Sequence, residues 1–342
     1  MAVTLQQIAD AAGVSRGTVD RALKNKGRIK PETAERVKKL AEEMGYIPSR
    51  AGRALAMAKR NIKIGVIIEP SQTEFIREML KGVEAAKKEV ESLEGTVDIF
   101  TIDGTDAQKE IEIMYRLRNE QYSGIAMVPA EDLVLRGLID EFSEKNGIPI
   151  VTFNSDLEGT RRLCYIGQNA IQSGKTAAGL MGDLLSGKGQ VAVISAFKSA
   201  PTVSNRVSGF IKELRTDYPG VDIIGVRYCY EDDWVAEKIT DEILDSHPNL
   251  SGIYLSASGV NGVCRVLEKY SKQNQVRVIA NDLVEGNIYW LKRGTINFLI
   301  GQNAWIQGYD PVMTLFRLFM DGKKPEKEFQ YTDIVIKTKY NI

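Results

Sequence analysis

A short run near the start of the chain has the residue types and spacing of a surface that reads double-stranded DNA. Its members are Arg16, Gly17, Thr18 and Arg21. If a helix begins after Ser15, these side chains lie on its outer face near its N-terminus, while Val19 and Leu23 face inward. Outward polar side chains at that end of a helix reach base edges in the major groove. The run therefore predicts a DNA-recognition helix.

Catalytic chemistry has little support in the sequence. The sole histidine, His247, precedes Pro248 in a polar turn, which is more typical of a surface residue than of a general base. No Walker pattern, G-x-S-x-G or H-E-x-x-H occurs. The pair Asp232-Asp233 lacks the ligand spacing of a calcium loop, and no C-x-x-C is present to bind zinc. We expect neither an enzyme nor a bound cofactor or metal.

Charge is divided unevenly along the chain. The 342 residues include 45 basic and 45 acidic side chains, but residues 1–60 hold 13 basic and 6 acidic ones. A basic segment ahead of an acidic remainder indicates a polyanionic partner or, alternatively, only a solvated surface. The hydrophobic fraction of 43% is enough for a large globular core. Three widely spaced cysteines, an odd number, indicate a reducing compartment without disulfides.

Three short helices account for the pattern of residues 1–46, which we call the head. Thr4 and Gln7 have capping-box spacing, which predicts a helix that begins at residue 5 and ends at Gly13. Ser15 is a suitable N-cap for the second helix, and two helices joined by a tight glycine turn form a helix-turn-helix. A third helix is expected to start at Pro31. The alternative is a helical bundle that binds no nucleic acid. Residues 47–61 are predicted to be a hinge that becomes helical once something stabilises it.

Residues 62–342, the body, alternate apolar strand patterns with amphipathic helix patterns. The strand runs begin with IKIGVII (62–68), TVDIFTI, GIAMVP and PIVTFN, and near residue 163 the cycle restarts with LCYIGQ. Helices are expected at 74–91, 106–120, 131–146, 203–216, 233–246 and 260–273. The alternation predicts two lobes of parallel sheet flanked by helices, with a cleft between them. Ligands of such sheets bind beyond the carboxyl ends of the strands.

The head and hinge resemble the DNA-binding region of the lac-repressor (LacI/GalR) family. The resemblance rests on TLQQIADAAGVS, the TVxR pattern within GTVDRAL, the third helix and YIPSRAGRAL. It implies that the hinge folds on operator DNA and that Leu55 wedges into the minor groove, as apolar side chains do when they kink a base step. An ordinary linker leucine is the alternative. The remaining predicted DNA contacts are Thr4, Ser15, Ser49, Arg50 and Arg53. Asp20 stands where the family commonly has serine, so no operator sequence is inferred.

The body resembles the effector domain of the same family and the pentose- and hexose-binding periplasmic proteins, which have the type I periplasmic-binding-protein fold. The resemblance implies effector contacts from Phe75, Asn154, Arg206, Trp234, Ser256, Asp282 and Gln302. Aromatic rings would cover the C–H face of a sugar, and the polar side chains would satisfy its hydroxyls. Ordinary packing or surface ion pairing is the alternative for each residue. Asn154-Ser155 replaces the Asp-Arg pair of many relatives, so a monosaccharide, a cyclitol, an amino sugar or a related polyol is expected.

Together these features predict a bacterial transcription regulator, and more specifically a repressor, that binds double-stranded operator DNA as a homodimer. The sequence has no secretory signal and no run of 18 apolar residues, so we expect a cytoplasmic protein that joins the nucleoid when bound to DNA, with no membrane contact. No leucine heptad follows the last strand, which favours a dimer over a tetramer. A transport-type sugar-binding protein and a regulator that responds to a protein partner are the alternatives.

Overall fold

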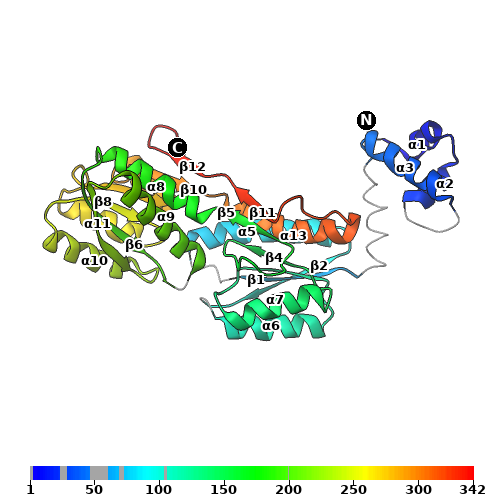
Figure 1. Cartoon of the computed structure of the whole chain (residues 1–342), viewed down its shortest axis with the longest axis horizontal. Helices are drawn as coiled ribbons and strands as arrows, with labels where there is room; N and C mark the ends of the chain where they lie inside the picture. Colours follow the sequence, from blue (N-terminus) through cyan, green and yellow to red (C-terminus); the bar gives the residue numbers. More distant parts are fainter. Residues whose placement is uncertain (1–2, 24–28, 47–60, 69–72, 104–105, 199) are drawn as a thin grey trace. The chain divides into compact units, whose positions relative to one another are not determined.

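The computed structural model describes the chain except for residues 1–2, 24–28, 47–60, 69–72, 104–105 and 199 (Figure 1). The chain divides into two compact units, Met1–Lys59 and Arg60–Ile342. Within the described residues, no helix combines the length and the apolar character needed to cross a membrane. Four of the predicted DNA contacts, Ser49, Arg50, Arg53 and Leu55, lie outside the described residues.

The described residues of the first unit form three helices: α1 (Leu5–Ala12), α2 (Arg16–Leu23) and α3 (Pro31–Glu43). Thr4 and Gln7 make the predicted capping box, in which each satisfies a backbone N–H of the other. Gly13 ends α1 at φ 62°, a left-handed conformation that glycine adopts without steric cost. A small core centred on Ile8, Val19 and Val37 joins the three helices. These three helices begin where the sequence predicted them, after Thr4, after Ser15 and at Pro31.

The second unit contains two six-stranded sheets. The first has the order β11-β5-β4-β3-β1-β2, and all of its neighbouring strands are parallel. Its strands are β1 (Lys63–Ile68), β2 (Thr96–Thr101), β3 (Gly124–Met127), β4 (Ile150–Phe153), β5 (Cys164–Gln168) and β11 (Phe329–Thr332). Its helices are α5 (Glu74–Glu91), α6 (Ala107–Asn119), α7 (Leu133–Glu144) and α13 (Ala304–Asp321). Figure 1 shows α6 and α7 on one face of this sheet and α5 and α13 on the other. We call this assembly lobe 1.

Lobe 2 is built on the second sheet, of order β12-β10-β9-β8-β6-β7, in which only β12 runs antiparallel to its neighbour. Its strands are β6 (Gly189–Ser195), β7 (Val221–Tyr228), β8 (Leu250–Leu255), β9 (Arg277–Asn281), β10 (Phe298–Gly301) and β12 (Val335–Lys337). Its helices are α8 (Ala170–Leu184), α9 (Pro201–Asp217), α10 (Asp233–Ser246), α11 (Val260–Lys269) and α12 (Glu285–Arg293). Separate apolar clusters lie on the two faces of this sheet, one including Phe210 and Tyr254 and the other Val263 and Leu267.

The boundary between the lobes differs from the prediction in one respect. The sequence pattern places LCYIGQ at the start of the second half, but β5 pairs with β4 and completes the first sheet. The chain then crosses to lobe 2 before α8, returns to lobe 1 between β10 and α13, and crosses again between β11 and β12. Strand pairing decides this assignment: β5 pairs with the preceding strand β4 on one side and with the distant β11 on the other, and the local apolar pattern does not show which sheet a strand joins.

Close helix contacts at glycines fix two helices that carry cleft residues. A Cβ atom at Gly308 of α13 would lie 1.9 Å from the carbonyl oxygen of Met79 on α5, and one at Gly174 of α8 would lie 2.0 Å from that of Arg206 on α9. Any larger side chain at either position therefore forces the helix pair apart. These contacts hold α13 against α5 and α9 against α8.

Candidate ligand cleft and nucleic-acid interface

A cleft of about 850 Å³ lies between the carboxyl ends of the two sheets. From lobe 1 it is lined by the segments that follow β1, β3 and β4, and from lobe 2 by those that follow β6, β7, β8 and β9. This is the edge at which parallel sheets place their ligands. The cleft is large enough to hold a small molecule such as a sugar.

Five of the seven predicted effector contacts line this cleft. They are Phe75, Asn154, Arg206, Asp282 and Gln302. Phe75 is in the first turn of α5, which Thr73 caps, and Asn154 directly follows β4. Arg206 is on α9, Asp282 follows β9, and Gln302 is in the crossover after β10. Residues that are distant in the sequence therefore meet at one site.

The other two predicted contacts, Trp234 and Ser256, do not line the cleft. Trp234 is in the first turn of α10, 60% exposed, and its ring packs under Lys238, whose Nζ lies 3.4 Å from the ring centroid. Ser256 is fully buried, and its hydroxyl donates a hydrogen bond to Oγ of Ser195. Its carbonyl accepts a hydrogen bond from Nη1 of Arg206 at 2.9 Å. Ser256 therefore positions Arg206 instead of contacting the cleft.

Arg206 and Asp282 are the charged groups at the inner end of the cleft. Arg206 is 2% exposed and also donates from Nη2 to Oε1 of Gln168 at 3.3 Å, while its Nε has no partner in the described part of the chain. Burial raises the pKa of the Asp282 carboxyl, and the charge of Arg206 and the hydrogen bond from Gln302 oppose that rise. The backbone of Asp282 has φ 75°, and Asn287 Nδ2 donates to its carbonyl at 3.0 Å. The loop thus holds the carboxylate in place.

A chain of side-chain hydrogen bonds crosses the base of the cleft from lobe 2 to lobe 1. Gln302 Nε2 donates to Oδ1 of Asp282 at 2.8 Å, and Gln307 Nε2 donates to Oε1 of Gln302 at 2.9 Å. Asn154 Nδ2 then donates to Oε1 of Gln307 at 3.2 Å. Three of these four residues line the cleft, and the fourth, Gln307, is fully buried on α13. Polar groups on the two lobes are therefore joined into one network, which we call the relay.

Other hydrogen bonds also connect the lobes, in addition to the relay and to the bond from Arg206 to Gln168. Thr202, on α9, donates from Oγ1 to the carbonyl of Asn154 at 2.6 Å. Glu74, on α5, accepts a hydrogen bond from the backbone N–H of Gly286 at 3.1 Å. Gly286 is in the first turn of α12, whose own N-cap residue, Val284, offers no side-chain acceptor. The carboxylate from lobe 1 thus caps a helix of lobe 2, where the helix dipole also favours negative charge.

The sequence patterns did not indicate the wall that follows β6 and β7. Phe197 and Tyr230 line the cleft with their rings edge to face, 5.8 Å apart between centroids. Glu231 and Asp233 line it as well. The polar run YEDD at 230–233, directly after an apolar strand, was a usable signal, because polar residues at a strand's carboxyl end commonly face ligand.

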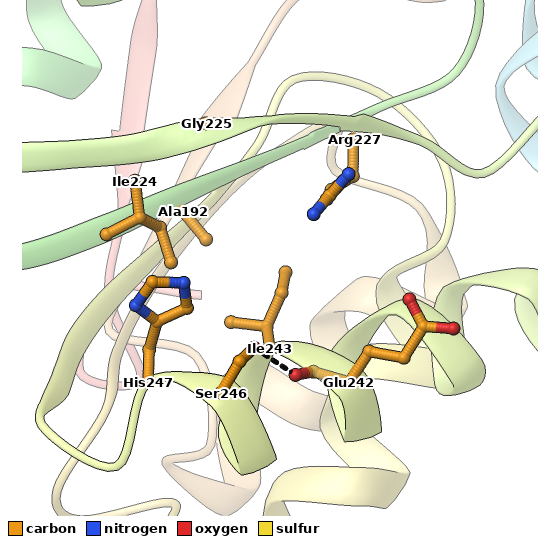
Figure 2. A pocket seen from close by; sticks show the side chains of 8 residues that line it. All are labelled: Ala192, Ile224, Gly225, Arg227, Glu242, Ile243, Ser246 and His247. Atoms are coloured by element: carbon orange, nitrogen blue, oxygen red, sulfur yellow. Dashed lines mark hydrogen bonds between the residues drawn. The ribbon is translucent and has the colours of Figure 1, made fainter.

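The sole histidine lies away from the cleft. His247 lines a small hollow of about 30 Å³. Figure 2 shows Ile224 next to its ring and Arg227 across the space. A hollow of this volume can hold no more than a water or two. In the part of the chain that the structure describes, no group of three or more His, Cys, Asp or Glu residues is arranged to hold a metal ion.

The predicted DNA-reading residues of the head lie on the surface of α2 or at its start. Ser15, Arg16, Gly17 and Arg21 are exposed, while Val19 is fully buried. Ser15 Oγ accepts a hydrogen bond from the backbone N–H of Thr18 at 3.2 Å and lies 2.9 Å from its hydroxyl, so these residues also cap the helix. Thr4 is exposed at the start of α1. The helix therefore separates a packed face from a polar, basic face, as a major-groove reader requires.

Comparisons with known proteins agree with both parts of the molecule. Residues 64–324 match the model of the periplasmic binding protein domain, and residues 4–49 match that of bacterial regulatory proteins of the lacI family. A solute-binding protein of an ABC transporter from Burkholderia graminis, solved in complex with D-arabinose, has a TM-score of 0.75 at 26% identity, covering 82% of this chain and 96% of that one.

Two relatives are named as regulators. The probable HTH-type transcriptional repressor ExuR of Bacillus subtilis is 29% identical over 216 residues, covering 62% of this chain and 60% of that protein. Catabolite control protein A of Priestia megaterium is 24% identical over 311 residues, covering 91% of this chain and 83% of that protein. The match thus spans about three fifths of ExuR and most of the second relative. The chain belongs to the family of periplasmic binding protein domains over residues 64–324, and ahead of it, at residues 4–49, it carries a DNA-binding domain of the lacI type.

Proposed function

We propose that this protein is a transcriptional repressor whose affinity for operator DNA is controlled by a small polyol bound in the cleft. The observation that carries the proposal is the presence, in one chain, of an exposed basic helix and a cleft whose two lobes are joined by hydrogen bonds. A DNA-binding protein does not need a ligand cleft, and a ligand-binding protein does not need an exposed basic helix. Together they match the needs of a sensor that reports on a ligand by binding or releasing DNA.

The chemistry of the cleft favours a ligand with several hydroxyls. Asn154, Asp282 and Gln302 offer carboxylate and amide groups that accept or donate to hydroxyls, and Nε of Arg206, which has no partner among the described residues, adds a donor. Phe75 and the ring pair Phe197–Tyr230 offer apolar faces for C–H groups. The similarity to a binding protein solved with D-arabinose supports the same class. A monosaccharide or cyclitol meets these requirements.

The proposed switch is a change in the closure of the lobes. A ligand that engages Asp282 on lobe 2 and Asn154 on lobe 1 alters the relay that joins them, and with it the balance between two closure states. Only a ligand with different affinities for the two states shifts that balance. A homodimer that presents two heads to a pseudo-palindromic operator, through hinge segments with Leu55 in the minor groove, converts the shift into DNA affinity. We place this activity in the bacterial cytoplasm, on chromosomal DNA.

A transport-type binding protein is the second candidate, because the body of this chain has the fold of a transporter's solute-binding protein. The basic head, which matches the lacI family model, favours the regulator. The test is a panel of sugars and cyclitols read by thermal shift on the full chain, followed by gel shift on the DNA upstream of its own gene. Ligand-dependent DNA binding supports the proposal. Ligand binding without any DNA binding at physiological salt contradicts it and supports the transport candidate.

A further inference from the structure

The charged residues that line the cleft are mostly acidic. In the described part of the wall the acidic side chains are Glu74, Glu231, Asp232, Asp233 and Asp282. The basic ones are Arg77 and Arg206. A concave site with low-dielectric walls concentrates the field of such a surplus, so the cleft attracts a cation and repels an anion.

Neutral groups, not cations, satisfy three of these carboxylates. Asp232 accepts from the backbone N–H of Trp234, and Asp233 accepts from Nδ2 of Asn261 and the N–H of Gly262. Glu74 accepts from Gly286. Among the described residues, none of the five cleft carboxylates takes part in an ion pair within 4.0 Å. Amide donors reduce the cost of burying these charges but leave the negative potential of the cleft in place.

Arg206 does not cancel the surplus. Both of its terminal nitrogens donate to neutral oxygens, those of Ser256 and Gln168. Its charge acts on Asp282, because it is the larger of the two influences that lower the pKa of that carboxyl. Arg206 and Asp282 therefore offset each other at the inner end of the cleft. The remaining carboxylates of the described cleft wall, which are Glu74, Glu231, Asp232 and Asp233, still outnumber its remaining basic residue, Arg77.

Glu231 is the carboxylate that has no partner at all in the described part of the chain. It lines the cleft in the turn after β7, where its side chain is exposed to solvent although the surrounding protein atoms raise its pKa by desolvation. Tyr230 and Glu231 both have a left-handed backbone, at φ 55° and 63°, which non-glycine residues adopt at a cost. Hydrogen bonds hold this turn, from the N–H of Tyr230 to the carbonyl of Ala196 and from that of Asp232 to Cys229. The turn thus presents an unpaired acid beside the aromatic pair Phe197–Tyr230.

We propose that the ligand of this cleft is an amine-bearing polyol, such as an amino sugar or an aminocyclitol, with its ammonium group at Glu231. This inference rests on the proposed function, because it concerns the same cleft. The ammonium group donates charge-assisted hydrogen bonds to Glu231, and the adjacent aromatic faces also favour a cation. The hydroxyls face Asp282, Asn154 and Arg206. A neutral polyol leaves Glu231 unpaired, and an acidic sugar places like charges together.

The test compares matched ligands on the full chain by isothermal calorimetry. The pairs are galactosamine with galactose, glucosamine with glucose, and an inosamine with its parent inositol, and galacturonate and glucuronate are the acidic members. We expect at least one amine to bind about tenfold tighter than its hydroxyl parent, which corresponds to about 1.4 kcal/mol. We expect no measurable binding of the uronates. Equal affinity within every pair, tighter binding of a uronate, or no binding of any amine overturns the inference.

Two variants locate the effect. Glu231→Gln removes the charge but keeps the shape, and it should bring the affinity of the amine down about tenfold, towards that of the parent. Glu242→Gln, which removes an exposed carboxylate of α10 outside the cleft, should leave both affinities unchanged. Equal effects of the two variants overturn the assignment to Glu231. If a neutral parent binds best and also changes DNA affinity, the proposed function survives while the amine is rejected. If an amine binds best but leaves DNA affinity unchanged, the amine ligand is supported and the proposed control of DNA binding is rejected.

Discussion

Gln307 donates a hydrogen bond from Nε2 to Oε1 of Gln302 at 2.9 Å, and this bond connects α13 of lobe 1 to the crossover that leaves lobe 2. Gln302 in turn contacts Asp282, and Gln307 contacts Asn154. A ligand that touches Asp282 or Asn154 therefore acts on a network that includes the other lobe. The cleft and the crossover form one polar unit, and in the proposed switch this unit couples ligand binding to lobe closure.

Loss of the buried amide at position 307 should weaken ligand binding. Gln307→Leu leaves Oε1 of Gln302 and Nδ2 of Asn154 without partners, and each buried unsatisfied group costs about 1–3 kcal/mol. We expect the affinity for the best ligand of the panel to fall about tenfold or more in calorimetry. Gln108→Leu, at an exposed position of α6, is the matched control. An affinity within twofold of the original chain would show that the relay does not support the site.

Removal of the capping carboxylate at position 74 should speed ligand release. Glu74→Ala deletes the acceptor for the Gly286 N–H and exposes the uncapped start of α12. A helix cap contributes about 1 kcal/mol, so we expect the dissociation rate to rise about fivefold in stopped-flow measurements. Glu78→Ala, on the same helix but paired with Lys81 at the surface, should have no effect. Equal rates for the two variants would contradict a role for Glu74 in holding the lobes together.

Each exposed arginine of α2 should contribute separately to DNA binding. Arg16→Ala and Arg21→Ala should each cost about 1–3 kcal/mol in operator affinity if they reach base edges. A residue that contacts only phosphate should instead reduce the salt dependence of binding by about one unit of slope. Fluorescence anisotropy across a salt series distinguishes the two roles. Lys39→Ala, at an exposed position of α3, is the control, and a loss as large as that of the arginines would argue against α2 as the reader.

The minor-groove wedge can be tested without a structure of the hinge. Leu55→Ala should weaken operator binding, because the kinked base step loses its apolar insert. The thermal unfolding of the body and its ligand affinity should be unchanged, since both depend on residues after 60. Operator affinity equal to that of the original chain would show that Leu55 does not act as a minor-groove wedge.

Local patterns predicted most of the helices and strands, because the start and end of each element depend mainly on residues that are close along the chain. The capping pair Thr4–Gln7 and the bounds of α5 and α10 follow from short-range periodicity and caps. The predicted helix at 260–273 was too long, because α11 ends at Lys269 and Ser271 has φ 54°. The assignment of β5 to lobe 1, and the course of the chain after β10, depend on which strands pair, and the apolar pattern of a strand does not record its partners.

The candidate site was predicted less completely than the fold. Residues at strand ends, such as Asn154 and Asp282, were found because the sheet topology brings such positions together. Trp234 was misplaced, because a residue in the first turn of a helix faces solvent or cleft according to the rotation of that helix, which packing decides. Gln307 and Glu74 carry no sequence signal for their roles, since each acts on a residue far away in the chain.

The mutual effect of ligand and operator on the full chain tests most directly whether ligand binding controls DNA binding. Operator affinity is measured by anisotropy with and without saturating ligand, and ligand affinity is measured by calorimetry with and without saturating operator. Both ratios should be the same factor, in the same direction, because coupling between two sites is reciprocal, and we expect that factor to exceed about fivefold. A ligand that binds the cleft while both ratios stay at one would contradict ligand control of DNA binding.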